Sequence, residues 1–225
     1  MNTLAKEPLA SLLQRLFAEA KVLSPTSVPA LADYWNALPA GEQARLMHTR
    51  TDYREFYERM KDIPLPVSPE TGRLLYVLAR HSNARSIVEF GTSFGLSTLH
   101  LAAALRDNGG GRVITTEFEA TKVARARRHF EEARLDDLIE IREGDALETL
   151  ARDLPEHVDL LLLDGAKGLY PDVLDRIEGR LRPGALVVAD NADFCPDYLL
   201  RVRALDSGYL CLPFGEDVEL SVRTG

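Results

Sequence analysis

The sequence predicts an α/β protein built on an open, doubly wound sheet of the Rossmann-like kind. From residue 86 onward, strand-like runs alternate with helical runs, and short connections join them. Residues 160–163 and 186–188 are apolar throughout, which is typical of strands buried on both faces of a parallel sheet. Right-handed crossovers through the helices then place such strands in one sheet.

The composition is that of an ordinary globular protein and argues against several other classes. The chain has 225 residues, 45% of them hydrophobic and 28% charged, which suits one α/β domain with an appended segment. The net charge of −8 argues against nucleic acid and anionic membranes as partners. Two cysteines form neither a disulfide framework nor a thiolate zinc site by themselves. With neither a signal peptide nor a membrane span in view, we expect a cytoplasmic protein.

Helices are expected over the first sixty-odd residues. Apolar residues recur at helical spacing between residues 9 and 20, with charged residues on the opposite face. A break is expected at Ser24-Pro25-Thr26 and a second helical stretch at residues 42–61. The proline-punctuated residues 63–67 should be extended. Ser68-Pro69-Glu70 then predicts a helix start, since it offers an N-cap serine, a proline at the first helical position and an acid in the first turn.

The remaining sequence predicts five parallel strands, the helices between them and a closing hairpin. The helices should begin near Gly95, Thr121, Ala146 and Tyr170. The last two strand-like runs flank a turn with no helix between them, which favours a hairpin. The predicted parallel strands are residues 86–90, 112–116, 138–142, 158–163 and 185–189, and the hairpin strands are residues 208–212 and 218–222.

Polar residues end the first two predicted strands, and ligands of open α/β sheets bind beyond the carboxyl ends of the strands. Gly91 and Gly95 allow a tight turn, but their G-x-x-x-G spacing is not the G-x-G-x-x-G of a dinucleotide site. Glu89 would repel a pyrophosphate and attract a cationic or hydroxyl-rich ligand. Glu117 ends the second strand, where an acid accepts hydrogen bonds from ribose hydroxyls, so we predict a nucleoside ligand. A glycine turn with solvated acids is the alternative.

Acidic and amide side chains follow the next three predicted strands. Asp145 could cap the following helix or accept a hydrogen bond from the amino group of an adenine. Asp164 follows the fourth strand, and Asp190 and Asn191 follow the fifth. Three oxygen donors at one sheet edge suit Mg²⁺, which prefers octahedral oxygen coordination. Separate roles as helix caps or loop residues are the alternative.

Together these segments resemble the class I S-adenosylmethionine (SAM)-dependent O-methyltransferases, specifically the metal-dependent catechol and caffeoyl-CoA O-methyltransferase family. The resemblance runs from about Pro66 to the C-terminus. It implies a seven-stranded sheet whose last strand is antiparallel. It also implies methyl transfer from SAM to a hydroxyl of a vicinal diol or catechol-like small molecule, with Mg²⁺ or another divalent cation. The motifs that carry it, in this order, are V-S-P-E-T-G-R-L-L, V-E-F-G-T-S-F-G-L-S-T, I-T-T-E, G-D-A, L-L-L-D-G-A-K and V-V-A-D-N.

The resemblance also assigns roles by motif position. Two acceptor hydroxyls would chelate the cation. The catalytic residues would be Lys167, which would take or stabilise the proton, and Asp164. The metal ligands would be Asp164, Asp190 and Asn191. The SAM-binding residues would be Val67, Glu89, Gly91 and Ser97 at the methionine part, Glu117 at the ribose, and Asp145 and Ala146 at the adenine.

Three departures from the family pattern leave the acceptor open. Catechol O-methyltransferases have a tryptophan just before the lysine, where this chain has Ala166. The segment after Asn191 is shorter than the acceptor loop of the plant-type enzymes, and its residues 194–196, Phe-Cys-Pro, could line the acceptor site or belong to the core. Glu216 is a candidate for the glutamate that contacts the second hydroxyl.

The organisation of the chain and two other functions also remain open at this stage. Residues 63–225 are predicted to form the methyltransferase domain. Residues 1–62 would cover the acceptor, contact a second copy in a homodimer, or both, and Trp35, Tyr53, Phe56 and Tyr57 suit either role. A metal-independent N- or O-methyltransferase is one alternative, against which the complete metal set argues. A nicotinamide-dependent oxidoreductase or a non-catalytic nucleoside-binding module is the other, and the missing dinucleotide motif argues against the dehydrogenase.

Overall fold

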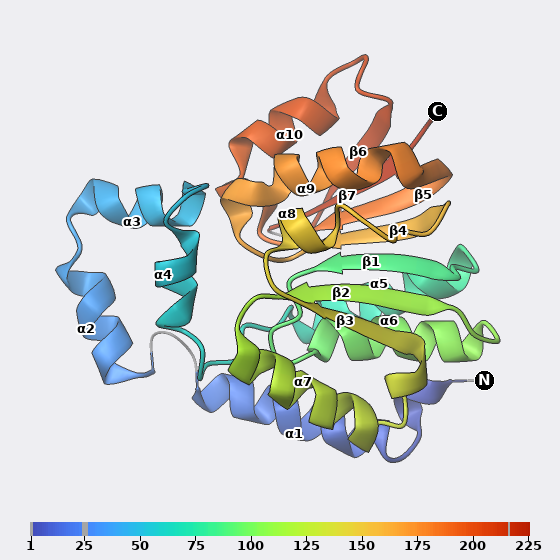
Figure 1. The fold of residues 1–225 in the computed structure, drawn as a ribbon, viewed down its shortest axis with the longest axis horizontal. Coiled ribbons are helices and arrows are strands. Elements are labelled where there is room, and N and C mark those ends of the chain that lie inside the picture. Colours follow the sequence, from blue (N-terminus) through green and yellow to red (C-terminus); the bar gives the residue numbers. More distant parts are fainter. Residues whose placement is uncertain (1, 24–26, 216) are drawn as a thin grey trace.

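A computed structural model describes residues 2–23, 27–215 and 217–225, and it shows a central sheet with helices on both faces (Figure 1). The strand order is β3-β2-β1-β4-β5-β7-β6. The pairs among the first five strands are parallel, whereas β7 is antiparallel to both of its neighbours. The doubly wound sheet with its last strand antiparallel is therefore confirmed. The strands are β1 (Ser86–Phe90), β2 (Arg112–Glu117), β3 (Ile139–Glu143), β4 (Val158–Leu163), β5 (Leu181–Ala189), β6 (Tyr209–Phe214) and β7 (Val218–Arg223).

The strand boundaries follow the sequence pattern closely, with one difference at β5. The structure starts β5 at Leu181, whereas the prediction placed its first residue at Ala185. In the sequence, the dipeptide Pro183-Gly184 predicts a turn. In the structure, Gly184 adopts a φ of 81°. The structure accommodates them where the register between β4 and β5 shifts, so the strand continues through an irregularity.

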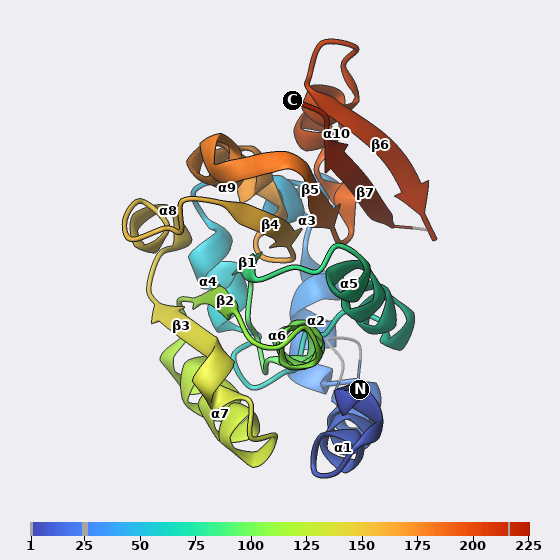
Figure 2. The same ribbon diagram turned by 90° about the vertical axis from the view of Figure 1, so that its right-hand side faces the viewer.

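Alternate residues of the strands face two apolar layers. Ile87 and Leu160 pack with one group of helices, whereas Val88 and Leu161 pack with the other. Figure 2 shows the two helical layers on either side of the sheet. The first layer contains α1 (Leu9–Val22), α5 (Pro69–His81), α6 (Leu96–Asp107) and α7 (Ala120–Glu132), and the second contains α8 (Ala146–Thr149), α9 (Tyr170–Ile177) and α10 (Pro196–Arg203).

The helix start predicted at Ser68 is confirmed. Its Oγ accepts a hydrogen bond from the backbone N–H of Thr71 at 3.0 Å, and Pro69 is the first residue of α5. The cap satisfies one of the donors that a helix N-terminus leaves without an intrahelical partner. It fixes where the chain enters the sheet domain after residues 64–67, which form no helix or strand, and the extended conformation expected for residues 63–67 stays a prediction.

The N-terminal helices divide into two parts. The buried leucines of α1 join the main core, and α1 lies beside α7 (Figure 1). The helices α2 (Pro29–Ala37), α3 (Ala40–His48) and α4 (Tyr53–Glu58) share a separate small apolar cluster around Leu46, Phe56 and Met60. The predicted break at residues 24–26 lies outside the described residues. None of the helices in the described part of the chain combines the length and apolar character that a membrane span needs.

The predicted helical stretch at residues 42–61 is interrupted. The Oγ1 of Thr49 accepts hydrogen bonds from the backbone N–H groups of Thr51 and Asp52, at 3.2 and 3.1 Å. Such a local side-chain bond competes with the helical backbone pattern, so α3 ends before it and α4 starts after it. After this break, α4 lies at the sheet edge that carries the predicted site residues, where Tyr53 and Arg54 contact Asp145.

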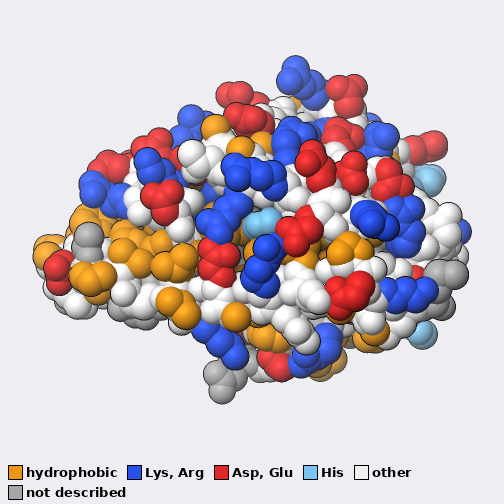
Figure 3. Space-filling view, turned by 90° about the horizontal axis from the view of Figure 1, so that it is seen from below, with side chains coloured by type: hydrophobic (Ala, Val, Ile, Leu, Met, Phe, Trp, Pro, Cys, Tyr) orange, Lys and Arg blue, Asp and Glu red, His pale blue; other side chains and the backbone are white. Residues whose placement is uncertain are grey.

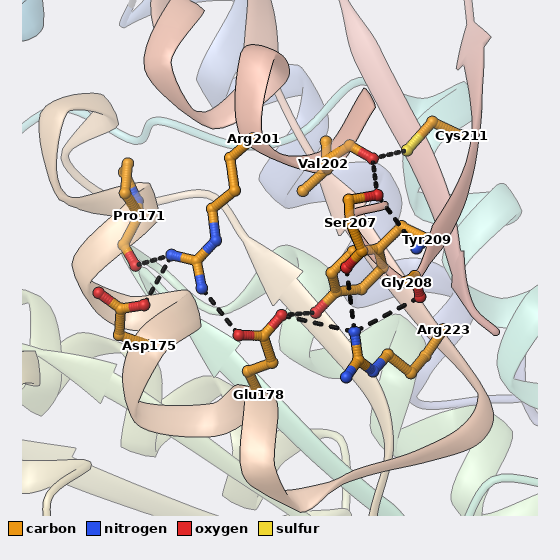
Figure 4. Close-up of polar contacts among 10 residues, drawn as sticks. All are labelled: Pro171, Asp175, Glu178, Arg201, Val202, Ser207, Gly208, Tyr209, Cys211 and Arg223. Carbon is orange, nitrogen blue, oxygen red and sulfur yellow. Dashed lines mark hydrogen bonds and ion pairs between the residues drawn. The ribbon is translucent and has the colours of Figure 1, made fainter. Parts of the chain in front are cut away.

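A polar network anchors the closing hairpin, which the structure confirms as β6 and β7 (Figure 4). Glu178, just after α9, accepts hydrogen bonds from Arg201 of α10 at 2.8 Å and from the hydroxyl of Tyr209 at 2.9 Å. Arg201 also pairs with Asp175 at 2.7 Å, and Arg223 of β7 lies 3.6 Å from Glu178. The network holds α9 and α10 against the start of β6 and the end of β7.

Candidate active site

Two cavities meet at the carboxyl edge of the sheet. The first lies beyond β1, β2 and β4, and the second lies between the ends of β4 and β5 and the helices α2 and α4. Tyr57, Leu65, Asp164 and Gly165 line both cavities. A molecule in one cavity can therefore touch a molecule in the other.

The first cavity brings together four of the residues predicted to bind SAM, namely Gly91, Glu117, Asp145 and Ala146. Tyr53, Phe118 and Lys122 line it as well, although sequence reasoning did not assign them to the site. For Phe118 the signal was available, because it directly follows Glu117 at the end of β2. Tyr53 comes from α4, and no local pattern indicates which way that helix packs.

Gly91 is required by a close approach of two chain segments. Its φ is 103°, and a Cβ built on it would lie 2.5 Å from the backbone oxygen of Asp164. Any other residue would strain the backbone and clash with the end of β4. The glycine therefore lets β1 and β4 end side by side, with Asp164 donating its backbone N–H to the carbonyl of Phe90 at 2.8 Å.

Glu117 is a carboxylate held in place by the backbone. It accepts hydrogen bonds from the N–H groups of Ser93 and Glu119 at 2.9 and 3.1 Å. Burial nevertheless raises the pKa of Glu117 above its ordinary value, against the opposing charge of Lys122 and these bonds. The side chain remains at the cavity wall, so it can accept further hydrogen bonds from a ligand.

Three predicted SAM-binding residues are buried and do not line either cavity in the described part of the chain. Glu89 is fully buried and accepts hydrogen bonds from the hydroxyls of Ser97 and Thr98. Burial raises the pKa of Glu89 to about 7, although these hydroxyls favour its anion. Val67 is 1% exposed. The roles of Val67, Glu89 and Ser97 at the methionine stay predictions.

Asp145 caps a helix, which was one of its two predicted roles. Its Oδ1 accepts a hydrogen bond from the N–H of Leu147 at 2.8 Å. Its Oδ2 accepts bonds from Arg54 at 2.5 Å and from the hydroxyl of Tyr53 at 3.2 Å, and both of these residues belong to α4. Burial would raise the pKa of Asp145, but these bonds outweigh it and lower the pKa. Adenine contact, its other predicted role, stays a prediction.

Asp164 and Asp190 converge, as the sequence pattern predicts. Their carboxyl groups are close enough to influence each other's pKa; Asp190 is buried, and the side chain of Asp164 is 10% exposed. Burial is the main cause that raises the pKa of both, and the neighbouring Asp164 adds to the shift that takes the pKa of Asp190 to about 8. Two buried carboxylates that repel each other form a site that favours a cation.

Lys167 supplies a cation next to this pair. Its Nζ donates to Asp164 Oδ1 at 3.1 Å and to the hydroxyl of Tyr170 at 2.9 Å, and it lies 3.3 Å from the backbone oxygen of Asp190. Burial would lower the pKa of Lys167, but Tyr170 and Asp164 outweigh it and hold the pKa well above its usual range. Lys167 is therefore an ammonium group fixed beside Asp164.

Asn191 lies at the same edge, in a left-handed backbone conformation with φ at 50°. Its Nδ2 donates to Asp217 Oδ2 at 2.8 Å, and the backbone oxygen of Asp217 accepts from the N–H of Ala192 at 2.8 Å. Since a carboxylate only accepts, this bond uses the amide nitrogen and leaves the amide oxygen as the donor that a cation needs. Asp217 was missed in the sequence because it belongs to the β6–β7 turn.

These residues fit a hard divalent cation by their chemistry. Two buried carboxyl groups and one amide oxygen are the ligand types that Mg²⁺ prefers. Among residues 2–23, 27–215 and 217–225, no group of three or more His, Cys, Asp or Glu is placed to hold a metal ion. The set thus depends on the amide of Asn191 as its third member.

The second cavity has a volume of about 600 Å³ and opens beside the predicted metal ligands. Asp164, Lys167, Asp190 and Asn191 line one end, and side chains of α2 and α4 line the other. Figure 3 shows apolar side chains gathered on this face at the end of the molecule formed by α2–α4. Trp35, Phe56 and Tyr57, which suit either an acceptor cover or a dimer contact by sequence, all line this cavity.

The segment after Asn191 does not contribute to either cavity. Cys195 belongs to the core, so that alternative is confirmed for it. Phe194 is 39% exposed and Pro196 is exposed at the start of α10, and neither lines a cavity. Ala166 is buried and lines the first cavity. Glu216 lies outside the described residues.

Comparisons with known proteins agree with this arrangement. Residues 88–192 match the family model described as a methyltransferase domain. Catechol O-methyltransferase from Niastella koreensis is 35% identical over 130 residues, which are 56% of this chain and 58% of that protein. The match thus spans less than two thirds of the length of this curated relative.

Solved structures agree over a larger part of the chain. An O-methyltransferase involved in tomaymycin synthesis in Streptomyces achromogenes, in complex with SAM, is 29% identical with a TM-score of 0.59, and the match covers 86% of this chain and 95% of that one. An O-methyltransferase from Bacillus cereus in complex with SAH shares the fold, with 23% identity, a TM-score of 0.66, and coverage of 89% and 100%. Residues 88–192 thus match a methyltransferase domain, the chain has the fold of solved O-methyltransferases, and its resemblance to the class I SAM-dependent O-methyltransferases of the catechol and caffeoyl-CoA type is confirmed.

Proposed function

We propose that this protein transfers a methyl group from SAM to one of two vicinal hydroxyls of a small molecule, using a divalent cation such as Mg²⁺ held by Asp164, Asp190 and Asn191. One observation carries the proposal: the buried carboxyl groups of Asp164 and Asp190 converge beside Lys167, where the two cavities meet. The methyltransferase domain match and the relative named catechol O-methyltransferase support the same reaction.

On the cofactor side, the first cavity is the place for SAM, which supplies the activated methyl group when bound. Glu117 would accept hydrogen bonds from the ribose hydroxyls, since two backbone N–H groups already orient its carboxylate. Asp145 and Ala146 would contact the adenine. Glu89, Ser97 and Val67 would support the methionine end from the buried layer behind Gly91.

On the acceptor side, a bound divalent cation would lower the pKa of an acceptor hydroxyl. Lys167 would stabilise the oxyanion, because its Nζ is an ammonium group fixed by Asp164 and Tyr170. Tyr57, which lines both cavities, would keep the acceptor oxygen and the methyl donor in one water-poor space.

The helices α2–α4 are the part of residues 1–62 that we propose as the acceptor cover. Residues of α2 and α4 line the second cavity, whereas α1 reaches it only through Ala20 among its described residues and otherwise packs into the core of the domain proposed for residues 63–225. The homodimer, the cytoplasmic location and the absence of nucleic-acid partners stay predictions.

The test is methyl transfer to catechol with SAM, measured in a chelator and after addition of Mg²⁺. We expect turnover to disappear in the chelator and to return with Mg²⁺. Calorimetry should show that Asp190→Asn loses Mg²⁺ binding, whereas Asp193→Asn, exposed in the same loop, retains it. Full turnover in the chelator would instead support a metal-independent methyltransferase, and binding of NAD without binding of SAH would support an oxidoreductase.

A further inference from the structure

The second cavity is lined by many more residues than the polar groups near the predicted metal ligands. Its volume is about 600 Å³, within the range of about 300–1,000 Å³ that accommodates drug-sized ligands. A single-ring diphenol at Asp190 and Asn191 would occupy only the polar end. The far end, which we call the distal wall, is formed by Leu31, Tyr34, Trp35, Phe56, Met60 and Pro64.

The distal wall is aromatic and rigidly packed. Trp35 and Phe56 pack with ring centroids 5.7 Å apart, and Phe56 meets Tyr57 edge to face at 5.2 Å. These rings connect the wall to Tyr57, which lies at the junction of the two cavities. Flat aromatic faces of this kind favour an aromatic ligand, since stacked and edge-to-face pairs add to the gain from apolar burial.

The charge of the distal wall is already compensated. Arg59 is the charged side chain that lines this end in the described part of the chain, and it pairs with Glu55 at 2.8 Å. The guanidinium also stacks over the ring of Tyr34, 4.5 Å from its centroid. An acceptor with a phosphate-bearing tail would find no unpaired cation here, whereas an uncharged ring system would bury apolar surface.

We propose that the acceptor is an extended, uncharged aromatic molecule whose vicinal hydroxyls lie at Asp164, Asp190 and Asn191 and whose remaining rings pack on the distal wall. Trp35 is then a specificity-determining residue that selects multi-ring over single-ring acceptors. Methylation of this acceptor rests on the proposed function, whereas packing of its rings on the distal wall rests on the cavity alone.

The kinetic test compares catechol with 3,4-dihydroxybiphenyl, which adds one uncharged ring to the same diol. With SAM and Mg²⁺, kcat/KM should be about tenfold or more higher for the biphenyl, mainly through KM, because the added ring leaves water. Trp35→Ala should lower kcat/KM far more for the biphenyl than for catechol, and so remove most of this preference. Equal values for the two acceptors in the wild type would overturn the proposal.

Leu46→Ala is the matched control for disturbed packing. Leu46 is buried in the same small cluster as Phe56 and Met60, but it does not line the cavity. It should keep the preference for the biphenyl. If Leu46→Ala and Trp35→Ala lose the preference equally, Trp35 acts through helix packing and not through ligand contact.

A binding measurement separates this proposal from the proposed function. Trp35 is the one tryptophan of the chain, so its emission reports on the distal wall without interference. Emission should change on titration with 3,4-dihydroxybiphenyl and stay constant with catechol. If neither acceptor is methylated, the proposed function fails. Emission then still tests whether the biphenyl binds the distal wall, and unchanged emission with the biphenyl would refute this proposal as well.

Discussion

Replacing Glu89 by glutamine should make the stability of the protein less sensitive to alkaline pH. Glu89 is fully buried, and burial raises its pKa from 4.5 to about 7. Because the folded state binds the proton more tightly than the unfolded state, the contribution to stability is complete below about pH 4.5 and is lost as the pH rises through about 7. The glutamine side chain has no proton to lose, so this loss should vanish.

The magnitude follows from the pKa difference. From 4.5 to about 7 the difference corresponds to about 3 kcal/mol in the free energy of unfolding. About 1.4 kcal/mol of this falls between about pH 6 and about pH 8.5. The free energy of unfolding of E89Q relative to wild type, from urea unfolding at both pH values, should therefore rise by about 1.4 kcal/mol at the higher pH.

Substitution of a second glutamate serves as a control, because it removes a carboxylate that is not buried. Glu143 ends strand β3, which is separated from β1 by β2, and is exposed. Glu143→Gln should give the same difference from wild type at both pH values. If E89Q also gave a pH-independent difference, the buried ionised carboxylate would not be the cause, and the reasoning would be refuted.

Three further predictions concern the site. Glu117→Ala should weaken SAH binding in calorimetry by about 1–3 kcal/mol, the usual loss for a hydrogen bond to a charged group, and equal binding would place the ribose elsewhere. Lys167→Ala should lower kcat by about 10²–10⁴-fold with little change in SAH affinity, whereas an unchanged kcat would remove it from the mechanism. Gly168→Ala should destabilise the protein by about 1–3 kcal/mol in thermal unfolding, because its Cβ would lie 2.6 Å from the backbone oxygens of His48 and Thr49. Gly179→Ala, with open space around its Cβ, should change stability far less, and equal losses would contradict the clash.

Local patterns were sufficient for much of the fold and for part of the site. The apolar runs of β4 and β5 predicted buried parallel strands, and Ser68-Pro69 predicted the start of α5, because these signals depend on neighbouring residues. Parallel strands end at one edge of a sheet, so Asp164 and Asp190 could be expected to converge. The break between α3 and α4 was missed because helical periodicity outweighed the single turn made by Thr49.

The sequence by itself therefore determined the order along the chain of the strands and of the helices between them, and which polar residues follow the strand ends. Only the tertiary structure decided which distant segments complete the site. Asp217 reaches Asn191 from the last turn, and α4 brings Tyr53 and Tyr57 to the two cavities. The physical reason is that the strand ends are set by hydrogen bonds of regular period, whereas the packing of a short helix depends on side-chain fit between segments far apart in the chain.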